Sequence, residues 1–208
     1  MAQAQISKTP PKAFLELRDY LIESGDVLRA TAEAIRQDVV DGAVDAIVAA
    51  LSAGKPFLVC GNGGSASDAM HITGELVGRF LLERRALKAI CLSDNAAVLT
   101  AWSNDYCYET VFARQVEAYG EAGAVLLGIS TSGASKNVIA AFQQARTMEI
   151  KTIALTGDGG GPLAPFADYL LAAPCRSTPL IQQVHICLYH YLCGKIEEKL
   201  FSIGTTAG

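Results

Sequence analysis

The sequence predicts an α/β fold, a three-layer sandwich in which helices flank a five-stranded parallel sheet and further helices precede it. Three observations support this fold class. Half of the 208 residues are hydrophobic and 18% are charged, which suits one sizeable buried core. Five short apolar runs alternate with helical stretches after residue 56, as in right-handed β-α-β crossovers. Clusters of glycine, serine and threonine end several of these runs.

Residues 1–53 are expected to form a helical extension of a single domain that covers 1–208. Between residues 13 and 51 the apolar side chains recur at intervals of three and four, the spacing of an amphipathic helix. The run 24–26 (SGD) is expected to divide this stretch into two helices. The apolar stripes favour a role for the extension in packing between subunits.

Beyond the extension, strands and helices alternate. The predicted strands are 57–60, 87–92, 124–129, 151–155 and 169–172. The predicted helices are 67–80, 96–102, 109–119, 135–148 and 179–200. Open parallel sheets bind ligands where their strands reach the carboxyl ends, and each Gly/Ser cluster of this chain follows a strand. The clusters therefore indicate a binding site at one edge of the sheet.

Composition argues against several classes of protein. A formal net charge of −4 without a basic stripe disfavours nucleic-acid partners. Residues 1–12 lack the apolar core of a signal peptide, and no apolar run approaches the roughly 18 residues of a membrane span. Six scattered cysteines without a CxxC pair favour buried free thiols over disulfides or a thiolate metal site. A cytoplasmic protein without a membrane partner is expected.

The segment 130–135 (STSGAS) is the clearest candidate for an anion site. Its hydroxyl side chains stand between a predicted strand and the start of a predicted helix: Ser130, Thr131, Ser132 and Ser135. Free backbone amides and the helix dipole attract a phosphate at such a position without a lysine. Ordinary capping is the alternative, but capping needs only one Ser or Thr. The segment therefore favours phosphate binding.

Two glycine-rich segments accompany the serine segment. Segment 61–65 (GNGGS) allows the backbone to approach a ligand closely, because glycine lacks a Cβ atom. It matches neither GxGxxG nor a P-loop, so nucleotide binding lacks its usual sequence features. Segment 156–161 (TGDGGG) is either part of the site or a flexible turn.

Polar residues on two predicted helices are candidates for chemistry. His71 and Glu75 lie four residues apart on one helical face, as a base and its orienting partner, two metal ligands or an exposed pair. Gln182, His185 and His190 lie among apolar residues of the last helix, where a core histidine bonded to a carbonyl is the alternative. Gln182 and His190 are about 12 Å apart along a helix axis. If both serve one site, different subunits are expected to supply them.

Seven runs of the sequence match those of a known family. They are 60–65 (CGNGGS), 68–71 (DAMH), 74–80 (GELVGRF), 104–106 (NDY), 125–135 (VLLGISTSGAS), 155–160 (LTGDGG) and 181–186 (IQQVHI). Together they cover nearly the whole chain in order and closely resemble the phosphoheptose isomerases, which are sugar isomerase (SIS) domain proteins.

This resemblance implies an isomerase that converts sedoheptulose 7-phosphate into D-glycero-D-manno-heptose 7-phosphate through an enediol, for the heptoses of bacterial surface polysaccharides such as lipopolysaccharide. It also implies a homotetramer with active sites between subunits. The implied catalytic residues are Glu75 as base and His190 as acid. The implied ligands of a zinc ion, reported in some members, are His71, Glu75, Gln182 and His190. The implied substrate-binding residues are Asn62, Gly63, Ser65, Arg79, Asp105, Ser130, Thr131, Ser132, Ser135 and Gln182.

The sequence departs from the family pattern at three positions, which leaves alternatives open. Leu180 and Gln183 stand where the family usually has Arg and Glu, and Cys107 replaces a usual glycine. The loss of two charges makes another ketose phosphate an alternative substrate. A non-catalytic relative that binds a replication initiator is a second alternative, disfavoured because Glu75 and His190 are present. A sugar-phosphate-sensing regulatory domain is a third, although no DNA-binding segment accompanies this one.

Overall fold

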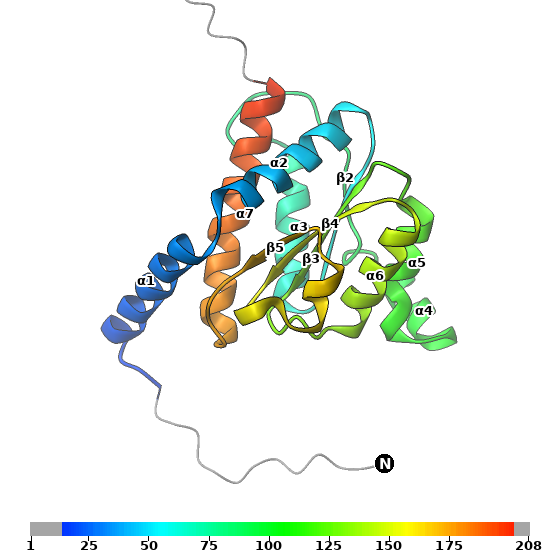
Figure 1. Cartoon of the computed structure of the whole chain (residues 1–208). Helices are drawn as coiled ribbons and strands as arrows, with labels where there is room; N and C mark the ends of the chain where they lie inside the picture. Colours follow the sequence, from blue (N-terminus) through cyan, green and yellow to red (C-terminus); the bar gives the residue numbers. More distant parts are fainter. Residues whose placement is uncertain (1–13, 202–208) are drawn as a thin grey trace, which may run out of the picture.

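The computed structural model describes residues 14–201, which form the predicted three-layer sandwich around a parallel sheet (Figure 1). The sheet order is β2-β1-β3-β4-β5, and every neighbouring pair is parallel. The strands are β1 (Phe57–Gly61), β2 (Ala89–Cys91), β3 (Val125–Ser130), β4 (Lys151–Thr156) and β5 (Tyr169–Ala172). All five predicted strands are thus confirmed.

The described residues also form seven α-helices and two 3-10 helices, which precede, connect and follow the strands. The helices are α1 (Leu17–Ala34), α2 (Gln37–Ser52), α3 (Gly64–Val77), α4 (Ala96–Asp105), α5 (Val111–Tyr119), α6 (Lys136–Thr147) and α7 (Thr178–Phe201), with η1 (Tyr108–Thr110) and η2 (Asp158–Phe166). Among residues 14–201, no helix combines the length and the apolar character needed to cross a bilayer.

The helices cover the two faces of the sheet as separate layers, because strand side chains alternate between faces. On one face, Val59 and Leu127 pack in a core with residues of α2, α3 and α7. On the other face, Leu58 and Leu126 pack with residues of α5 and α6. Figure 1 shows α2, α3 and α7 on one side of the strands and α4, α5 and α6 on the other.

The predicted break at 24–26 is wrong. Helix α1 continues through Gly25 to Ala34, and the chain turns at Ile35 and Arg36 before α2. A helical glycine costs only about 1 kcal/mol relative to alanine, so one glycine does not end a helix. The hydroxyl of Ser24 also donates to the carbonyl of Tyr20 within the same helix, at 2.7 Å. The described part of the N-terminal extension is therefore two helices, but divided ten residues later than predicted.

The six cysteines are free, but only half of them match the expectation of buried thiols. Cys60, Cys91 and Cys193 are buried, and burial raises the pKa of each of these three thiols. Cys107 and Cys175 are partly exposed and Cys187 is exposed. Burial was therefore predicted correctly for the thiols of β1, β2 and the last turns of α7.

A buried ion pair fastens the segment after α3 onto α7. The carboxylate of Glu197 on α7 accepts from Nε of Arg84 at 2.9 Å, and both side chains are 1% exposed. The same carboxylate accepts the backbone amides of residues 80–82 at 2.8–2.9 Å. Burial alone would raise the pKa of Glu197, but these donors outweigh it and lower the pKa. Arg84 in turn donates to backbone carbonyls at the end of α3, including those of Glu75 and Leu76.

Removing this carboxylate should destabilise the protein strongly. Glu197→Ala leaves the Arg84 guanidinium buried without its charged partner, so the free energy of unfolding should fall by about 3–5 kcal/mol. The measurement is urea unfolding followed by circular dichroism at one protein concentration. Glu198→Ala is the control, because Glu198 is exposed and its ion-pair partner among residues 14–201 is the surface residue Lys195, so this variant should cost less than about 1 kcal/mol. Equal losses of unfolding free energy in the two variants would contradict the role of Glu197 in a stabilising buried ion pair.

Candidate functional site

Three loops meet at the carboxyl edge of the sheet. In the register, Gly61 at the end of β1 pairs with Ile129, and Ser130 at the end of β3 pairs with Thr156. The loops that follow β1, β3 and β4 therefore start at nearly the same level along the strands, offset by about one residue. This is the edge where ligands of parallel sheets bind.

The first loop is held by a side-chain network that the sequence did not reveal. The side-chain amides of Asn62 and Asn137 bond each other reciprocally, at 2.9 and 2.8 Å. The hydroxyl of Tyr108 also donates to Oδ1 of Asn62 at 2.6 Å. A Cβ atom on Gly61 would lie 2.5 Å from the carbonyl oxygen of Ser65, so the tight turn requires glycine there. Asn62, Tyr108 and Asn137 help to line a cavity of about 360 Å³.

In the serine loop (residues 130–135), the hydroxyl groups of Ser130, Ser132 and Ser135 form hydrogen bonds within the loop. Ser135 is the N-cap residue of α6, but its side chain makes no capping hydrogen bond. Its Oγ lies 2.9 Å from Oγ of Ser130 instead. Oγ of the exposed Ser132 accepts from the amide of Ala134 at 3.2 Å. Helix capping by Ser135 therefore does not account for this cluster of hydroxyls.

The third glycine-rich segment packs against the serine loop. Gly133 has a φ of +63°, and a Cβ atom on it would lie 2.0 Å from the carbonyl oxygen of Gly160. The amide of Leu163 donates to the carbonyl of Gly133 at 2.9 Å, and the amide of Gly157 donates to Thr131 at 3.0 Å. This segment is thus a packed support for the serine loop rather than a free turn.

A second group of polar side chains forms where α3 meets α7. His71, Glu75 and His190 each offer one ligand atom, and these atoms all lie within 4.8 Å of one another. Nε2 of His71 is 3.0 Å from Oε1 of Glu75. The ring of Phe80 stacks on His190, with 5.5 Å between centroids and 15° between planes. Because Glu197 accepts the amide of Phe80, the ion pair on α7 also positions this ring.

The three side chains form a donor set that suits zinc. Two imidazole nitrogens and one carboxylate oxygen are typical protein ligands of catalytic zinc, with a fourth position left for water or substrate. His71 is exposed and the other two are partly exposed, so a small molecule can reach the cluster. The residues present therefore fit the metal that the resemblance implies.

Other predicted site residues lie away from this cluster. Gln182 lies at the first turn of α3, where a Cβ atom on Gly64 would be 2.3 Å from its Nε2. Gly64 and Glu75 are eleven residues apart on α3, or roughly 16 Å along the axis. Arg79 is exposed and its Nε is 3.5 Å from Glu83. The exposed Asp105 ends α4, and its only side-chain partner among the described residues is Asn104.

The remaining predicted substrate residues belong to the loops. Gly63 is the N-cap residue of α3 with a φ of 56°, and Ser65 is buried in the first turn. Ser130 is buried at the end of β3, and Thr131 is partly exposed beside it. The predicted site thus divides within one chain into two groups. The loop group consists of the predicted substrate residues in the loops after β1 and β3, at the sheet edge. The His/Glu group consists of His71, Glu75 and His190, between α3 and α7.

The three departures from the family pattern have structural contacts. Leu180 is 2% exposed in the first turn of α7. Nε2 of Gln183 donates to the hydroxyl of Tyr20 at 3.0 Å and so joins α7 to α1. Cys107 has a φ of −160°, an extended conformation that any residue adopts, so glycine is not required there.

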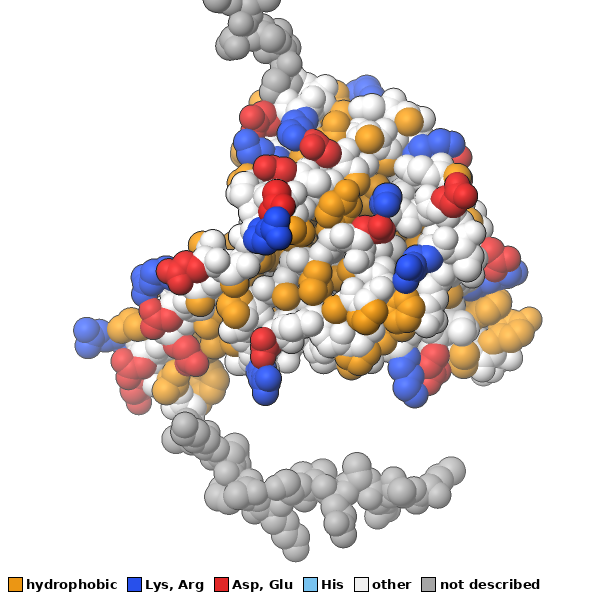
Figure 2. All heavy atoms as spheres, viewed as in Figure 1, with side chains coloured by type: hydrophobic (Ala, Val, Ile, Leu, Met, Phe, Trp, Pro, Cys, Tyr) orange, Lys and Arg blue, Asp and Glu red, His pale blue; other side chains and the backbone are white. Residues whose placement is uncertain are grey.

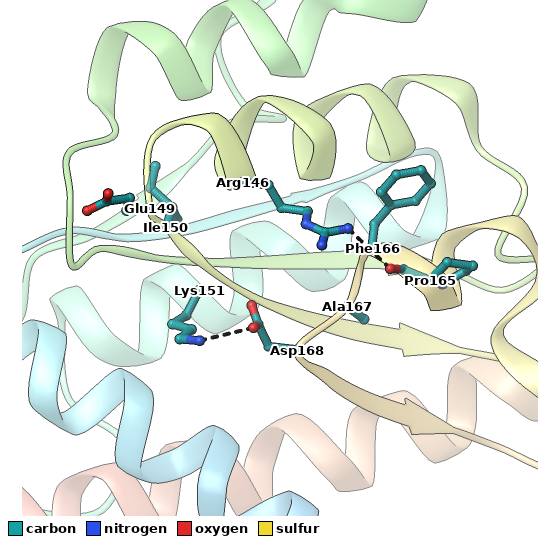
Figure 3. A pocket seen from close by; sticks show the side chains of 8 residues that line it. All are labelled: Arg146, Glu149, Ile150, Lys151, Pro165, Phe166, Ala167 and Asp168. Carbon is teal, nitrogen blue, oxygen red and sulfur yellow. Dashed lines mark hydrogen bonds and ion pairs between the residues drawn. The ribbon is translucent and has the colours of Figure 1, made fainter.

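A cavity at the opposite edge of the sheet is a weaker candidate. It has a volume of about 350 Å³ and lies beside the start of β4 (Figure 3). Its two cations are already paired, Arg146 with the carbonyl of Pro165 at 3.4 Å and Lys151 with Asp168 at 3.1 Å. The carboxyl edge, with its clustered hydroxyls, is therefore the stronger candidate for a binding site.

The chain is similar to known sugar isomerases over most of its length. A model of the SIS domain family matches residues 19–157. Phosphoheptose isomerase of Crocosphaera subtropica is 53% identical over 150 residues, which cover 72% of this chain and 76% of that one. The enzyme of the same name from Helicobacter pylori is 47% identical over 187 residues, 90% and 93% of the two chains. The structure of phosphoheptose isomerase from Neisseria gonorrhoeae superposes with a TM-score of 0.82 at 38% identity, covering 88% and 97%.

His185 lies outside both groups of site residues and belongs to the core. It is fully buried, and its Nε2 donates to the carbonyl of Thr156 at 3.1 Å. Burial lowers the pKa of His185 to about 4 from an ordinary value of 6.5, although the bond to Thr156 opposes this shift. Between about pH 6.5 and pH 4, the unfolded chain therefore binds more protons at this histidine than the folded chain does. The free energy of unfolding falls as the pH drops through this range.

His185→Gln should flatten this pH dependence, since glutamine does not titrate. The free energy of unfolding of the unmodified protein should fall by roughly 2 kcal/mol more than that of the variant between pH 7 and pH 5. Urea unfolding at both pH values measures the difference, in which every shared titrating group cancels. Parallel losses in the two proteins would show that His185 is not buried neutral.

Proposed function

The chain belongs to the phosphoheptose isomerases of the SIS domain family, and on this premise we propose that it converts sedoheptulose 7-phosphate into D-glycero-D-manno-heptose 7-phosphate. The observation that carries the proposal is the convergence of Glu75 with His190, because moving a carbonyl between two carbons needs a base and an acid. We further propose that the protein acts in the cytoplasm, as its composition favours, and that it supplies heptoses for surface polysaccharides, as the family resemblance implies.

In the proposed reaction, the two groups of side chains divide the work. The serine loop binds the phosphate through its hydroxyls and the amides at the start of α6, and this remote binding energy holds the sugar in register. Glu75 removes the proton from C1, and His190 transfers protons on the oxygens and to C2 of the enediol. Only one oxygen of Glu75 faces His71, so its carboxylate has a second oxygen for the proton.

We propose zinc as the metal, held by His71, Glu75 and His190. The donor set supports this choice. A bound zinc ion would supply polarisation of the substrate carbonyl. Gln182, assigned from the resemblance as a further ligand and substrate contact, lies about 12 Å along α7 from His190. We therefore propose that Gln182 reaches the site of a neighbouring subunit.

A homotetramer is part of the same proposal. The distance between the loop group and the His/Glu group supports sites shared between subunits. Apolar side chains of α1 are exposed, among them Leu17 at 73% and Leu21 at 59%, and Figure 2 shows apolar surface on this helix. A groove of about 300 Å³ between α1, α2 and α7 continues this surface. Residues 14–53 of the N-terminal extension would then pack against other copies.

The main experiment assays the purified protein with a panel of ketose phosphates of five, six and seven carbons, with and without a chelator. The proposal expects turnover of sedoheptulose 7-phosphate above the others and loss of turnover with the chelator. Preference for a shorter ketose phosphate would move the assignment to another sugar. Binding of a protein partner without any turnover would favour the non-catalytic alternative. Light scattering of the same sample measures the number of subunits.

Glu75→Gln should lower kcat by at least about 100-fold, because the amide cannot accept the proton. Phosphosugar binding and subunit number should not change, because the loop group and the apolar surfaces are intact. The measurement combines steady-state kinetics, calorimetry and zinc content. Glu83→Gln, a 91% exposed position close in sequence, is the control and should keep full activity. A fully active Glu75→Gln would remove the proposed base.

Ser132→Ala should raise KM about tenfold or more with a smaller change in kcat, since one hydrogen bond to a charged group is lost. The measurement is KM for sedoheptulose 7-phosphate together with the inhibition constant of inorganic phosphate. Ser52→Ala is the control, because Ser52 is exposed at the end of α2. An unchanged KM and phosphate affinity would argue against the serine loop as the phosphate site.

A further inference from the structure

Behind the His/Glu group lies a buried polar pair, Asp68 and Tyr189, to which the proposed reaction gives no part. Asp68 precedes His71 by one turn of α3 and is 9% exposed. Its Oδ2 atom is buried without a hydrogen-bond partner among the described residues. Tyr189, next to His190 on α7, is 1% exposed, and its hydroxyl lies 2.9 Å from Nδ1 of His71. The carboxylate of Asp68 neighbours the same hydroxyl of Tyr189.

Two acceptors compete for the single phenol proton. If Tyr189 donates to Nδ1 of His71, Oδ2 of Asp68 stays buried and unpaired, which is unfavourable for a carboxylate. If Tyr189 donates to Asp68 instead, the phenol oxygen can accept a hydrogen bond from Nδ1–H of His71. The second arrangement gives Asp68, Tyr189 and Nδ1 of His71 a partner each, and it leaves Nε2 of His71 as a bare lone pair that faces Oε1 of Glu75.

We infer that Asp68 and Tyr189 are positioning residues that hold His71 with its proton on Nδ1 and its Nε2 lone pair aimed into the His/Glu group. The inference rests on the proposed function, because it gives Nε2 the role of a metal ligand. Nε2 then faces Oε1 of Glu75 at 3.0 Å, and two acceptors at this distance are stabilised by a positive charge between them. The pair thereby prepares the site for a cation.

The ring of Tyr189 has a separate structural role that a substitution can preserve. It lies edge-on to both imidazoles, with centroids 5.4 Å from His71 and 4.8 Å from His190. Tyr189→Phe removes the hydroxyl and keeps the ring, so it tests the hydrogen bonds without opening a cavity. Tyr20→Phe is a matched control, because the hydroxyl of Tyr20 also bonds a side chain of α7, that of Gln183.

The experiment measures zinc affinity of the full chain by competition with a chromophoric chelator. Tyr189→Phe and Asp68→Asn should each weaken zinc binding by about 10–100-fold, the usual effect of losing a group that orients a metal ligand. The double variant should be little weaker than Tyr189→Phe alone, because one break already interrupts the chain of bonds. Tyr20→Phe should bind zinc as the unmodified protein does. Equal affinities in Tyr189→Phe and the unmodified protein would overturn the inference, as would additive losses in the double variant.

A second measurement separates this inference from the choice of metal. Nitrogen-15 NMR of the zinc-free protein at pH 8 reports which ring nitrogen of His71 carries a proton. A proton on Nδ1 in the unmodified protein, altered in Tyr189→Phe, supports the positioning role even if zinc does not bind. A bare Nδ1 in the unmodified protein overturns it, whatever the zinc affinity.

Discussion

The buried pair of Glu197 and Arg84 is the constraint on which the His/Glu group depends. Two opposite charges that are 1% exposed are stable only because each also satisfies backbone groups, amides of 80–82 on one side and carbonyls of α3 on the other. Helix α3 carries His71 and Glu75, whereas α7 carries His190. The pair therefore limits how the two helices shift relative to each other, and with them the three ligand atoms.

The loops at the carboxyl edge of the sheet are held in a different way, by backbone packed directly against backbone. Gly133 and Gly160 approach so closely that a side chain on Gly133 would collide with the opposite carbonyl. This contact braces the serine loop, and the reciprocal amides of Asn62 and Asn137 brace the neighbouring loop. Hydroxyls held in fixed positions suit an anion better than mobile ones, since less ordering is required on binding. The braced loop therefore supports the proposal that a phosphate binds there without a lysine.

Local patterns in the sequence predicted the strands well and the helix boundaries less well. Strands β1, β3 and β4 are apolar runs that end at Gly, Ser or Thr, and these end signals are visible in the sequence without a structure. Helix α3 begins at Gly64 rather than at residue 67, because Gly63 has a positive φ and starts the helix directly after the turn. Its end at Val77 precedes the predicted one, since the amides of 80–82 bond Glu197 instead. A contact more than 100 residues distant has no local signal.

By itself, the sequence determined the alternation of strands and helices, the position of the Gly/Ser loops at strand ends, and the i,i+4 spacing of His71 and Glu75. These are local properties, set by side-chain periodicity and by the backbone freedom of glycine. The family resemblance implied that His190 joins His71 and Glu75, and the tertiary structure brings the three together. Only the tertiary structure decided that Gln182 lies at the other end of α3 and that Asp68 and Tyr189 lie behind His71. Such contacts depend on how α3 and α7 pack against each other on one face of the sheet, which no spacing along one helix encodes.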